Sequence, residues 1–247
     1  MPLTLSDAAK QVISGSTIVL DLDGTLVDTA PDLVGTLNLL LIAEGLPSIS
    51  VKQIRPMIGR GARVMIERGF AAAGEPLDPA RVPALFARFI DLYQDRIADE
   101  SAPFPGAIEA MDALRGAGAR LAICTNKRTS LSVSLLNALN IADRFDAVVG
   151  ADSVPASKPD AGHLIAAVEQ AGGRLERALM VGDSGADAAA ARAAGVPLVL
   201  VSFGYTETPA AQLGADILID HFDELASACA RLLGAPAAPC PAGSQRV

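Results

Sequence analysis

The chain has 247 residues, of which 51% are hydrophobic, and it carries 20 basic and 28 acidic side chains for a formal net charge of −8. This length and composition allow a large core, in one domain or in a domain with an inserted module, and exclude disorder over most of the chain. No cluster of lysine and arginine indicates a nucleic-acid partner, and no run approaches the about 18 apolar residues of a membrane-spanning helix.

The cysteines give information about redox environment. Cys124, Cys229 and Cys240 are odd in number and widely spaced, without the paired spacing of a metal site. Cys124 lies in an apolar run, which predicts a buried, unreactive thiol. Residues 1–16 lack the charged and then apolar pattern of a signal peptide. Together these features favour a reducing cytoplasm.

The first predicted strand is the apolar run 18–20, and it ends at a carboxylate. Asp21 follows the strand directly, Asp23 comes two residues later, and Gly24-Thr25 then predicts a turn. Alternate residues of an extended chain point the same way, so the two carboxylates share one side. They repel each other and need a cation or a proton between them. This arrangement suits a hard divalent metal and acid–base chemistry.

Residues 29–102 are predicted to be all helical. Four helices are expected in this segment. The first covers 33–44, the second begins at a capping box formed by Ser50 and Gln53, the third covers 62–73, and the fourth begins at Asp78-Pro79. Their apolar stripes indicate the core of a helical bundle. We interpret this segment as a cap inserted after the first strand.

From residue 103 onwards, helices and strands alternate. Strands are predicted at 120–124, 147–149, 178–181, 196–201 and 217–219, with a helix before or after each. The alternation predicts an α/β fold with a doubly wound parallel sheet, whose ligands gather at the carboxyl ends of the strands. We expect a catalytic core of residues 1–28 and 103–233. The Pro- and Ala-rich tail, 234–247, is expected to be disordered.

Chemically active side chains gather at four places next to predicted strands. These are Asp21 and Asp23, Thr125-Asn126-Lys127, Ser157-Lys158-Pro159-Asp160, and Gly182-Asp183-Ser184 with Asp187. Singly, each has a plain explanation, because Thr125 and Ser184 can cap helices, Asp183 can form a turn and Lys158 can be solvated. Their order and their strand-end placement together predict one site.

These four motifs, spread over residues 17–233, resemble those of the haloacid dehalogenase superfamily. The helical insertion resembles the C1-type cap of that superfamily. The string from Asp21 to Leu33, together with Ile58-Gly59-Arg60-Gly61, resembles its phosphoglycolate phosphatase branch. The resemblance implies a Rossmann-like core and a Mg²⁺-dependent phosphatase that acts on a small phosphorylated metabolite such as 2-phosphoglycolate.

The resemblance also implies roles for the aspartates. Asp21 would attack phosphorus and form an aspartyl-phosphate. Asp23 would protonate the leaving alkoxide and then deprotonate the attacking water. Mg²⁺ would bind Asp21, the backbone carbonyl of Asp23, and Asp183. Asp187 would lie behind this set or orient a metal-bound water.

Four further residues are implied to hold the phosphate. Thr125, the backbone N–H of Asn126 and Gly24 would bind the phosphoryl oxygens. Lys158 would offset the negative charge that the nucleophile and the phosphate concentrate in one place.

The chain has further cations and two histidines whose roles differ in kind. Arg60 lies between two glycines of the cap, where it could pair with a substrate carboxylate or could simply be exposed. Arg63 and Lys127 are weaker candidates for the same role. His163 and His221 have no partners at ligand spacing, which predicts structural or surface roles.

Other functions remain open at this stage. A sugar phosphomutase similar to β-phosphoglucomutase would keep both aspartates and a similar cap, and a related phosphatase could act on pyrophosphate or a sugar phosphate. A receiver-like signalling domain also phosphorylates an aspartate on a parallel sheet, but it lacks a long insertion between Asp28 and Thr125. Neither a monomer nor a homodimer is favoured by the sequence.

Overall fold

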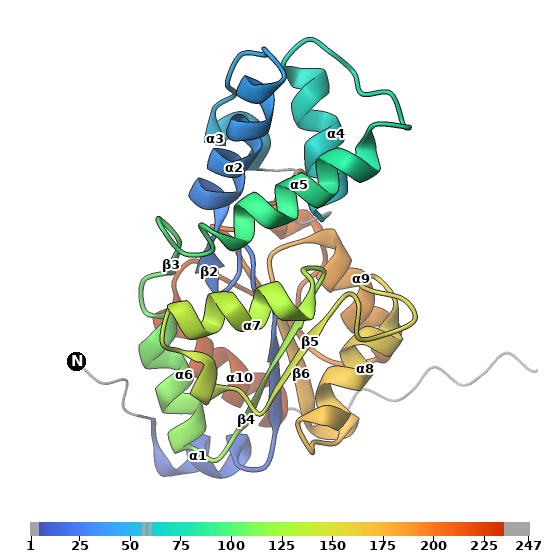
Figure 1. The fold of residues 1–247 in the computed structure, drawn as a ribbon. Coiled ribbons are helices and arrows are strands. Elements are labelled where there is room, and N and C mark those ends of the chain that lie inside the picture. The colour runs from blue at the N-terminus through green and yellow to red at the C-terminus, as the bar shows by residue number, and fades with distance from the viewer. Residues whose placement is uncertain (1–4, 56–57, 59–60, 235–247) are drawn as a thin grey trace, which may run out of the picture.

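The computed structural model describes residues 5–55, 58 and 61–234. The chain forms a unit built on a parallel sheet, which we call the sheet unit, and a group of helices above it in Figure 1, the helical unit. No helix within these described residues is long and apolar enough to cross a membrane.

The sheet unit contains six parallel strands in the order β5-β4-β1-β6-β7-β8. The strands are β1 (Thr17–Leu20), β4 (Arg120–Thr125), β5 (Ala147–Gly150), β6 (Ala178–Gly182), β7 (Leu198–Val201) and β8 (Ile217–Ile219). The central strand β1 pairs with β4 and β6, so that Leu20 lies opposite both Ile123 and Val181. This register brings the chain segments that follow all three strands to one edge, as the sequence predicts.

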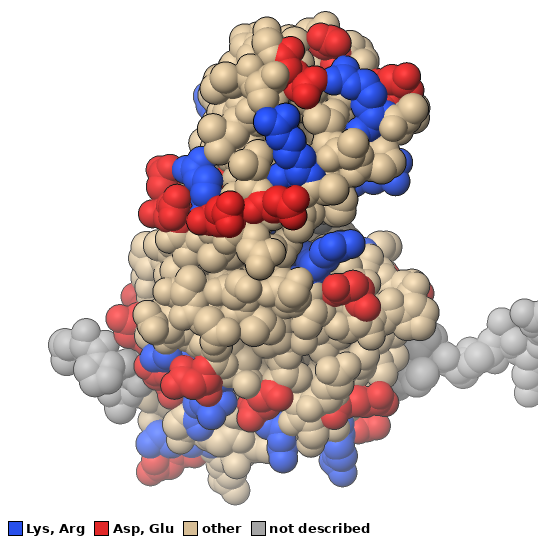
Figure 2. All heavy atoms as spheres, viewed as in Figure 1, with Lys and Arg blue, Asp and Glu red and all other residues tan. Residues whose placement is uncertain are grey.

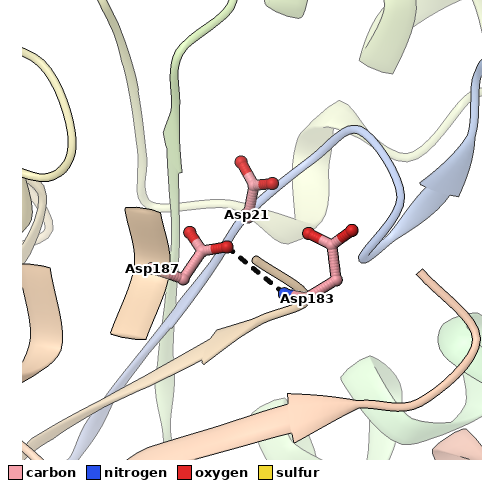
Figure 3. Close-up of side chains that lie close together, drawn as sticks. All are labelled: Asp21, Asp183 and Asp187. Carbon is pink, nitrogen blue, oxygen red and sulfur yellow. Dashed lines mark hydrogen bonds between the residues drawn. The ribbon is translucent and has the colours of Figure 1, made fainter. Parts of the chain in front are cut away.

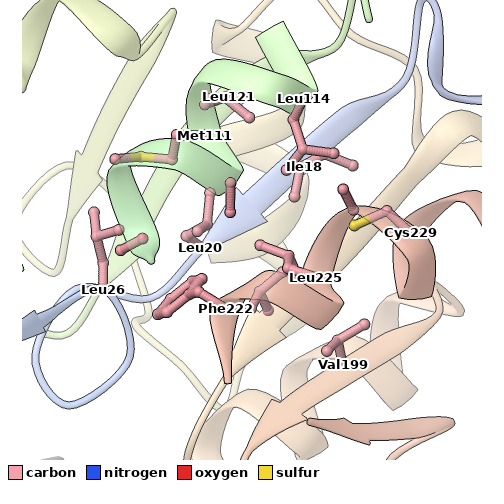
Figure 4. Close-up of a cluster of buried hydrophobic side chains, with 14 of the residues drawn as sticks. Ile18, Leu20, Leu26, Met111, Leu114, Leu121, Val199, Phe222, Leu225 and Cys229 are labelled. Atoms are coloured by element: carbon pink, nitrogen blue, oxygen red, sulfur yellow. The ribbon is translucent and has the colours of Figure 1, made fainter. Parts of the chain in front are cut away.

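Helices cover both faces of the sheet, which confirms the doubly wound α/β fold. One face carries α1 (Asp7–Ile13), α6 (Ala107–Gly116), α7 (Thr129–Ala138) and α10 (Leu225–Gly234), and the other carries α8 (Ala161–Gln170) and α9 (Gly185–Ala194). Figure 4 shows Ile18 and Leu20 of β1 packed between Leu114 of α6 and Leu225 of α10. Each such side chain stabilises the fold by roughly 1.5–3 kcal/mol through burial alone.

The two cysteines in the described chain are free and buried. Cys124 faces the α8 and α9 side of the sheet, and Cys229 of α10 lies in the core on the opposite face (Figure 4). Burial raises the pKa of Cys124 to about 12, so that thiol is protonated and unreactive at neutral pH. The prediction of an inert thiol at this position agrees with its environment.

The helical unit has an apolar core of its own. It consists of α2 (Ala30–Ala43), α3 (Val51–Ile54), α4 (Ala62–Ala72) and α5 (Val82–Gln94). Leu37 and Leu40 of α2 pack with Phe70 of α4 and Phe89 of α5. The antiparallel pair β2 (Val27–Asp28) and β3 (Ala102–Pro103) connects this unit to the sheet unit, so both connecting chains run side by side.

Some elements differ from the sequence-based prediction. The fourth cap helix begins at Val82 and not at Asp78-Pro79, because the Asp78 side chain accepts from the N–H of Ala80 at 2.9 Å and forms a turn there. Helix α1 and the β2–β3 pair were not predicted. The last helix is preceded by a separate 3-10 turn, Phe222–Glu224. The tail beyond Gly234 lies outside the described residues.

Candidate active site

The segment after β1 carries the first two aspartates. The N–H of Asp21 donates to the carbonyl of Val181 at 2.9 Å, which keeps this residue anchored to the sheet. The chain then turns at Gly24, where φ is +86° and an added Cβ would lie 2.6 Å from the Tyr205 ring and 2.7 Å from Asp183 Oδ2. Only glycine fits this position, because it tolerates positive φ and has no side chain.

Three buried carboxylates meet beyond the ends of the central strands (Figure 3). They belong to Asp21 after β1, Asp183 after β6, and Asp187 in the first turn of α9, and one oxygen of each lies within 4.8 Å of the others. We call these three residues the carboxylate cluster. Oδ2 of Asp187 accepts from the N–H of Asp183 at 3.2 Å and from Ser184 N and Oγ at 3.0 and 2.7 Å. Asp187 therefore caps α9 and also fixes the backbone of Asp183.

Lys158 supplies the positive charge inside this cluster. Its ammonium lies 2.7 Å from Oδ1 of Asp21 and 2.7 Å from Oδ1 of Asp187, and its side chain is 3% exposed. The Lys158 backbone is held on both sides: its N–H donates to Nδ1 of His163 at 3.1 Å, and its carbonyl accepts from Nδ2 of Asn126 at 3.0 Å. Burial lowers the pKa of Lys158, but the negative charges of Asp187 and Asp21 raise it by a larger amount, so the pKa lies above its ordinary value. This lysine is therefore charged at neutral pH.

The charge balance of the cluster favours a bound cation. Burial raises the pKa of Asp21 to about 6 although Lys158 opposes the shift, and burial together with Asp187 and Asp21 holds the pKa of Asp183 well above its ordinary value. The three carboxylates of the cluster are thus accompanied by one ammonium group, that of Lys158, which contacts Asp21 and Asp187. Their hard oxygen donors suit Mg²⁺ or Ca²⁺. Both oxygens of Asp187 are engaged by Lys158 and the α9 cap, and both oxygens of Asp183 accept hydrogen bonds, from the Thr25 hydroxyl and from the N–H of Tyr205, so these contacts alone do not single out the direct ligands.

Asp23 belongs to a second buried group at the border of the helical unit. Both of its carboxylate oxygens accept from Nζ of Lys127, at 2.8 and 3.0 Å, and Oδ1 also accepts from the Thr29 hydroxyl at 2.7 Å. The same ammonium lies 4.7 Å from the centre of the Tyr93 ring in α5. The pair therefore connects the segment after β4 with Thr29, at the start of the helical unit, and with Tyr93 of α5.

A cavity of about 310 Å³ lies between the two units. Its polar floor is made of Asp21, Asp23, Thr125, Asn126, Lys127 and Lys158. Its apolar wall comes largely from the helical unit: Leu33, Ile58, Met65, Phe86, Phe89 and Ile90. On the face that Figure 2 shows, the surface narrows between the two units, and acidic and basic side chains are interspersed over both. A small ligand with a charged end could bind against the floor.

The arrangement matches a known family. The sequence profile of the haloacid dehalogenase-like hydrolases matches residues 18–201, about three quarters of the chain. The chain belongs to this family. The matched segment contains all four strand-end motifs as well as the helical unit, and the receiver-like alternative does not account for it.

Individual relatives are similar over nearly the full length of this hydrolase. A phosphoglycolate phosphatase of Caulobacter vibrioides is 57% identical over 92% of this chain and 96% of its own. Among solved structures, a predicted phosphoglycolate phosphatase of Haemophilus somnus has a TM-score of 0.80 at 30% identity, covering 86% of this chain and 97% of that one. CbbY of Rhodobacter sphaeroides, solved in complex with phosphate, has a TM-score of 0.71 at 26% identity, covering 85% and 96% of the two chains.

The fold brings most of the expected site residues together. Those at the cavity floor or in the carboxylate cluster are Asp21, Asp23, Thr125, Asn126, Lys158, Asp183 and Asp187. Gly24 lies under the ring of Tyr205, beside Asp183. Arg60 lies outside the described residues. Arg63 lines the cavity at its rim, where its side chain is 64% exposed and pairs with Glu67 at 3.2 Å. The roles of all these residues stay predictions.

The sequence reasoning missed Thr29, Tyr93 and Tyr205 as neighbours of the site. The helical spacing of Tyr93 predicts only that it packs among the helices of residues 29–102, and that spacing does not show that its hydroxyl group borders a cavity. Tyr205 follows β7, so the strand-end rule that found the other motifs could have found it. His163 has the predicted structural role, since it is buried and holds Lys158, and the exposed His221 caps the Phe222–Glu224 turn.

Proposed function

We propose that this hydrolase is a Mg²⁺-dependent phosphatase that cleaves a small phosphate monoester, 2-phosphoglycolate, through an aspartyl-phosphate at Asp21. One observation carries the proposal. The Asp21 carboxylate borders the cavity floor with one oxygen fixed by Lys158, and Asp23 borders the same floor. A nucleophile with a separate acid–base group beside it is the minimum set for double displacement on phosphorus.

In the first displacement, Asp21 attacks phosphorus. Its Oδ1 is fixed by Lys158, and within the described chain Oδ2 accepts no hydrogen bond, so Oδ2 is the oxygen that can form the new bond. The bond from phosphorus to the ester oxygen breaks, and Asp23, which enters this step as a carboxylic acid turned away from Lys127, gives its proton to the departing alkoxide. The Thr125 hydroxyl and the N–H of Asn126 bind the phosphoryl oxygens, while Lys158 stabilises the negative charge.

In the second displacement, Asp23 acts as a base. Its carboxylate takes a proton from a water molecule, and the water oxygen attacks the phosphorus of the aspartyl-phosphate. The bond between phosphorus and Asp21 breaks, which releases inorganic phosphate, frees the Asp21 carboxylate and leaves Asp23 protonated, as it was before the first displacement.

The carboxylate cluster supports a Mg²⁺ requirement. Asp21, Asp183 and the backbone carbonyl of Asp23 would hold the ion, and Asp187 would position Asp183 and Lys158. When bound, the ion would supply positive charge that reduces the repulsion between the Asp21 carboxylate and the substrate phosphate.

The helical unit supports the proposal of a cap. We assign residues 29–102 to this cap and residues 1–28 and 103–233 to the core. The cap covers the cavity floor with apolar side chains such as Phe86 and Phe89. An apolar cover limits the entry of water, which would otherwise weaken the electrostatic interactions below it.

The shape and chemistry of the cavity support a small anionic substrate. The described cap wall offers apolar side chains and few hydrogen-bond partners, whereas a sugar phosphate needs partners for several hydroxyl groups. This difference favours a phosphatase over a sugar phosphomutase. The names of the relatives point to the same substrate, since the Caulobacter protein is called a phosphoglycolate phosphatase.

A phosphate-release assay tests the proposal. The purified protein with Mg²⁺ is given 2-phosphoglycolate, glucose phosphates, pyrophosphate and nucleoside monophosphates. We expect 2-phosphoglycolate to rank first, and Asp21→Asn to lower kcat by about 1,000-fold or more. Asp7→Asn makes the same chemical change at an exposed position on α1 and should leave kcat unchanged. Near wild-type turnover in Asp21→Asn would rule out the nucleophile, and an isomerised sugar phosphate as product would favour the mutase.

A further inference from the structure

Lys127 is a buried cation that the proposed chemistry leaves without a role. Its side chain is 6% exposed, it lines the cavity floor, and its ammonium contacts both carboxylate oxygens of Asp23. Burial lowers the pKa of Lys127, but Asp23 and Tyr93 more than compensate, and the pKa lies above its ordinary value. A buried ammonium needs an anionic partner at all times.

Tyr93 places an unused hydroxyl group at the same spot. The residue is 1% exposed and lines the cavity, and its Oη has no hydrogen-bond partner among the described residues. Burial raises the pKa of Tyr93 to about 12, so the hydroxyl keeps its proton at neutral pH and can donate. Buried donors without partners are uncommon in folded proteins, and a ligand that brings an acceptor would satisfy this one.

The other described cations around the cavity do not fit the same role. Lys158 is committed to Asp21 and Asp187. Arg63 is exposed and pairs with Glu67, and the exposed Arg128 stacks on the ring of Phe86, 5.6 Å from its centre. Lys127 is therefore the described cation that is both buried and free to exchange its partner.

Exchange of that partner follows from the position of Asp23. Asp23 must direct an oxygen towards the leaving-group oxygen of the substrate, yet in the free protein its oxygens point to Lys127 and Thr29. Turning away removes the anion from Lys127. An ester that carries its own carboxylate one carbon from the leaving oxygen replaces that anion, whereas a neutral ester leaves the ammonium buried and unpaired.

We propose that Lys127 and Tyr93 form a carboxylate subsite that selects phosphate esters bearing a carboxylate next to the leaving-group oxygen. The subsite rests on the proposed phosphatase activity and deepens it. Lys127 binds the carboxylate by charge, the Tyr93 hydroxyl donates a hydrogen bond to it, and Asp23 is released towards the ester oxygen. Selection then affects both substrate binding and turnover.

The test compares two esters that differ at one group. 2-Phosphoglycolate and ethyl phosphate have the same phosphate and the same ester carbon, with a carboxylate in one and a methyl group in the other. The wild type should have the higher kcat/KM for 2-phosphoglycolate. Lys127→Met should lower this preference about 100-fold, because a charge-assisted contact is lost. Tyr93→Phe should lower it about tenfold, because a single hydrogen bond to a charged group is lost.

Arg63→Met is the matched control, because it removes a cation from the rim of the same cavity and should leave the preference unchanged. A wild type that prefers neither ester, or a Lys127→Met variant that loses activity equally on both, overturns the subsite while the phosphatase stands. A wild type that hydrolyses no phosphate ester overturns both. Should Lys127→Met fail to fold, Tyr93→Phe decides, since it removes only an unpartnered hydroxyl group and an unchanged preference there overturns the subsite.

Discussion

The phenol group of Tyr205 donates a hydrogen bond to the carboxylate of Asp28, and this contact joins the loop after β7 to the last residue of β2. The same phenol oxygen accepts from the N–H of Ala30 at 3.0 Å, and the backbone N–H of Tyr205 donates to Oδ2 of Asp183 at 2.5 Å. One buried residue therefore links the carboxylate cluster to the start of the helical unit.

The first prediction compares two buried tyrosines. Tyr205→Phe removes the hydroxyl partner of Asp28 and of the N–H of Ala30, although Arg55 still lies 3.9 Å from Asp28, and we expect the free energy of unfolding to fall by about 1–3 kcal/mol. Tyr93→Phe removes a hydroxyl group without a partner and should change it by less than about 0.5 kcal/mol. Urea denaturation of both variants measures the difference. Equal losses would show that the Tyr205 contacts add nothing to stability.

The second prediction concerns the ion pair between Lys158 and Asp187. In Asp187→Asn the amide oxygen can still accept from the α9 cap, but its NH₂ group then faces the Lys158 ammonium. We expect the free energy of unfolding to fall by about 1.5–3 kcal/mol, because the Lys158 ammonium keeps Asp21 but loses its second carboxylate partner. Ser184→Ala, which removes only the 2.7 Å hydroxyl contact to Asp187, should cost about 1 kcal/mol. If the two variants lose equal stability in denaturant titrations, the pair is not important for stability.

The third prediction concerns the contact between the start of α2 and residues 100–101, next to the connection between the two units. Asp32 accepts from the N–H of Glu100 at 3.1 Å and from Ser101 N and Oγ at 2.8 and 2.6 Å, so it joins α2 to the chain that returns from the helical unit. Asp32→Ala should lower the free energy of unfolding by about 3 kcal/mol, and Ser101→Ala by about 1 kcal/mol. Chemical denaturation checks both values. A loss in Asp32→Ala no larger than in Ser101→Ala would contradict this account.

The fourth prediction is a pH dependence of stability at His163. Burial lowers the pKa of His163 below its ordinary value of 6.5. Below that pH the unfolded chain binds a proton that the folded protein does not, so the contribution of His163 to stability is lost as the pH falls and is constant above it. Protonation would also break the hydrogen bond from the Lys158 N–H.

Denaturation at about pH 7.5 and about pH 5.5 measures this effect, since the window spans the ordinary pKa. Between these values the wild type should lose more stability than His163→Gln does. His221→Gln is the control, because His221 is 48% exposed, and it should keep the wild-type dependence. An unaltered pH dependence in His163→Gln would show that other groups govern it.

The fifth prediction concerns the metal. An ion that binds only the folded protein raises the midpoint of thermal unfolding. Added Mg²⁺ should therefore raise the Tm of the wild type and leave that of Asp183→Asn unchanged, and a chelator should abolish phosphatase activity without unfolding the protein. Calorimetry and phosphate release measure the two effects. A shift of equal size in Asp183→Asn would place the ion elsewhere.

The sequence by itself determined the fold class and the composition of the active site. Parallel strands with helical crossovers must bring their carboxyl ends to one edge, so the segments after 18–20, 120–124 and 178–181 could be placed together from local patterns alone. The resemblance of the motifs around Asp21, Thr125, Lys158 and Asp183 to those of the haloacid dehalogenase superfamily then implied phosphoryl transfer. These inferences depend on backbone periodicity and chain order, which a sequence contains directly.

Only the tertiary structure decided what surrounds that site. The pairing of Lys127 with Asp23 and the link from Tyr205 to Asp28 join residues 104 and 177 positions apart. The unpartnered hydroxyl of Tyr93 borders a cavity between the two units. Such contacts depend on how the helical unit packs against the sheet unit. Hydrophobic spacing shows that a side chain is buried, but not which polar group meets it there.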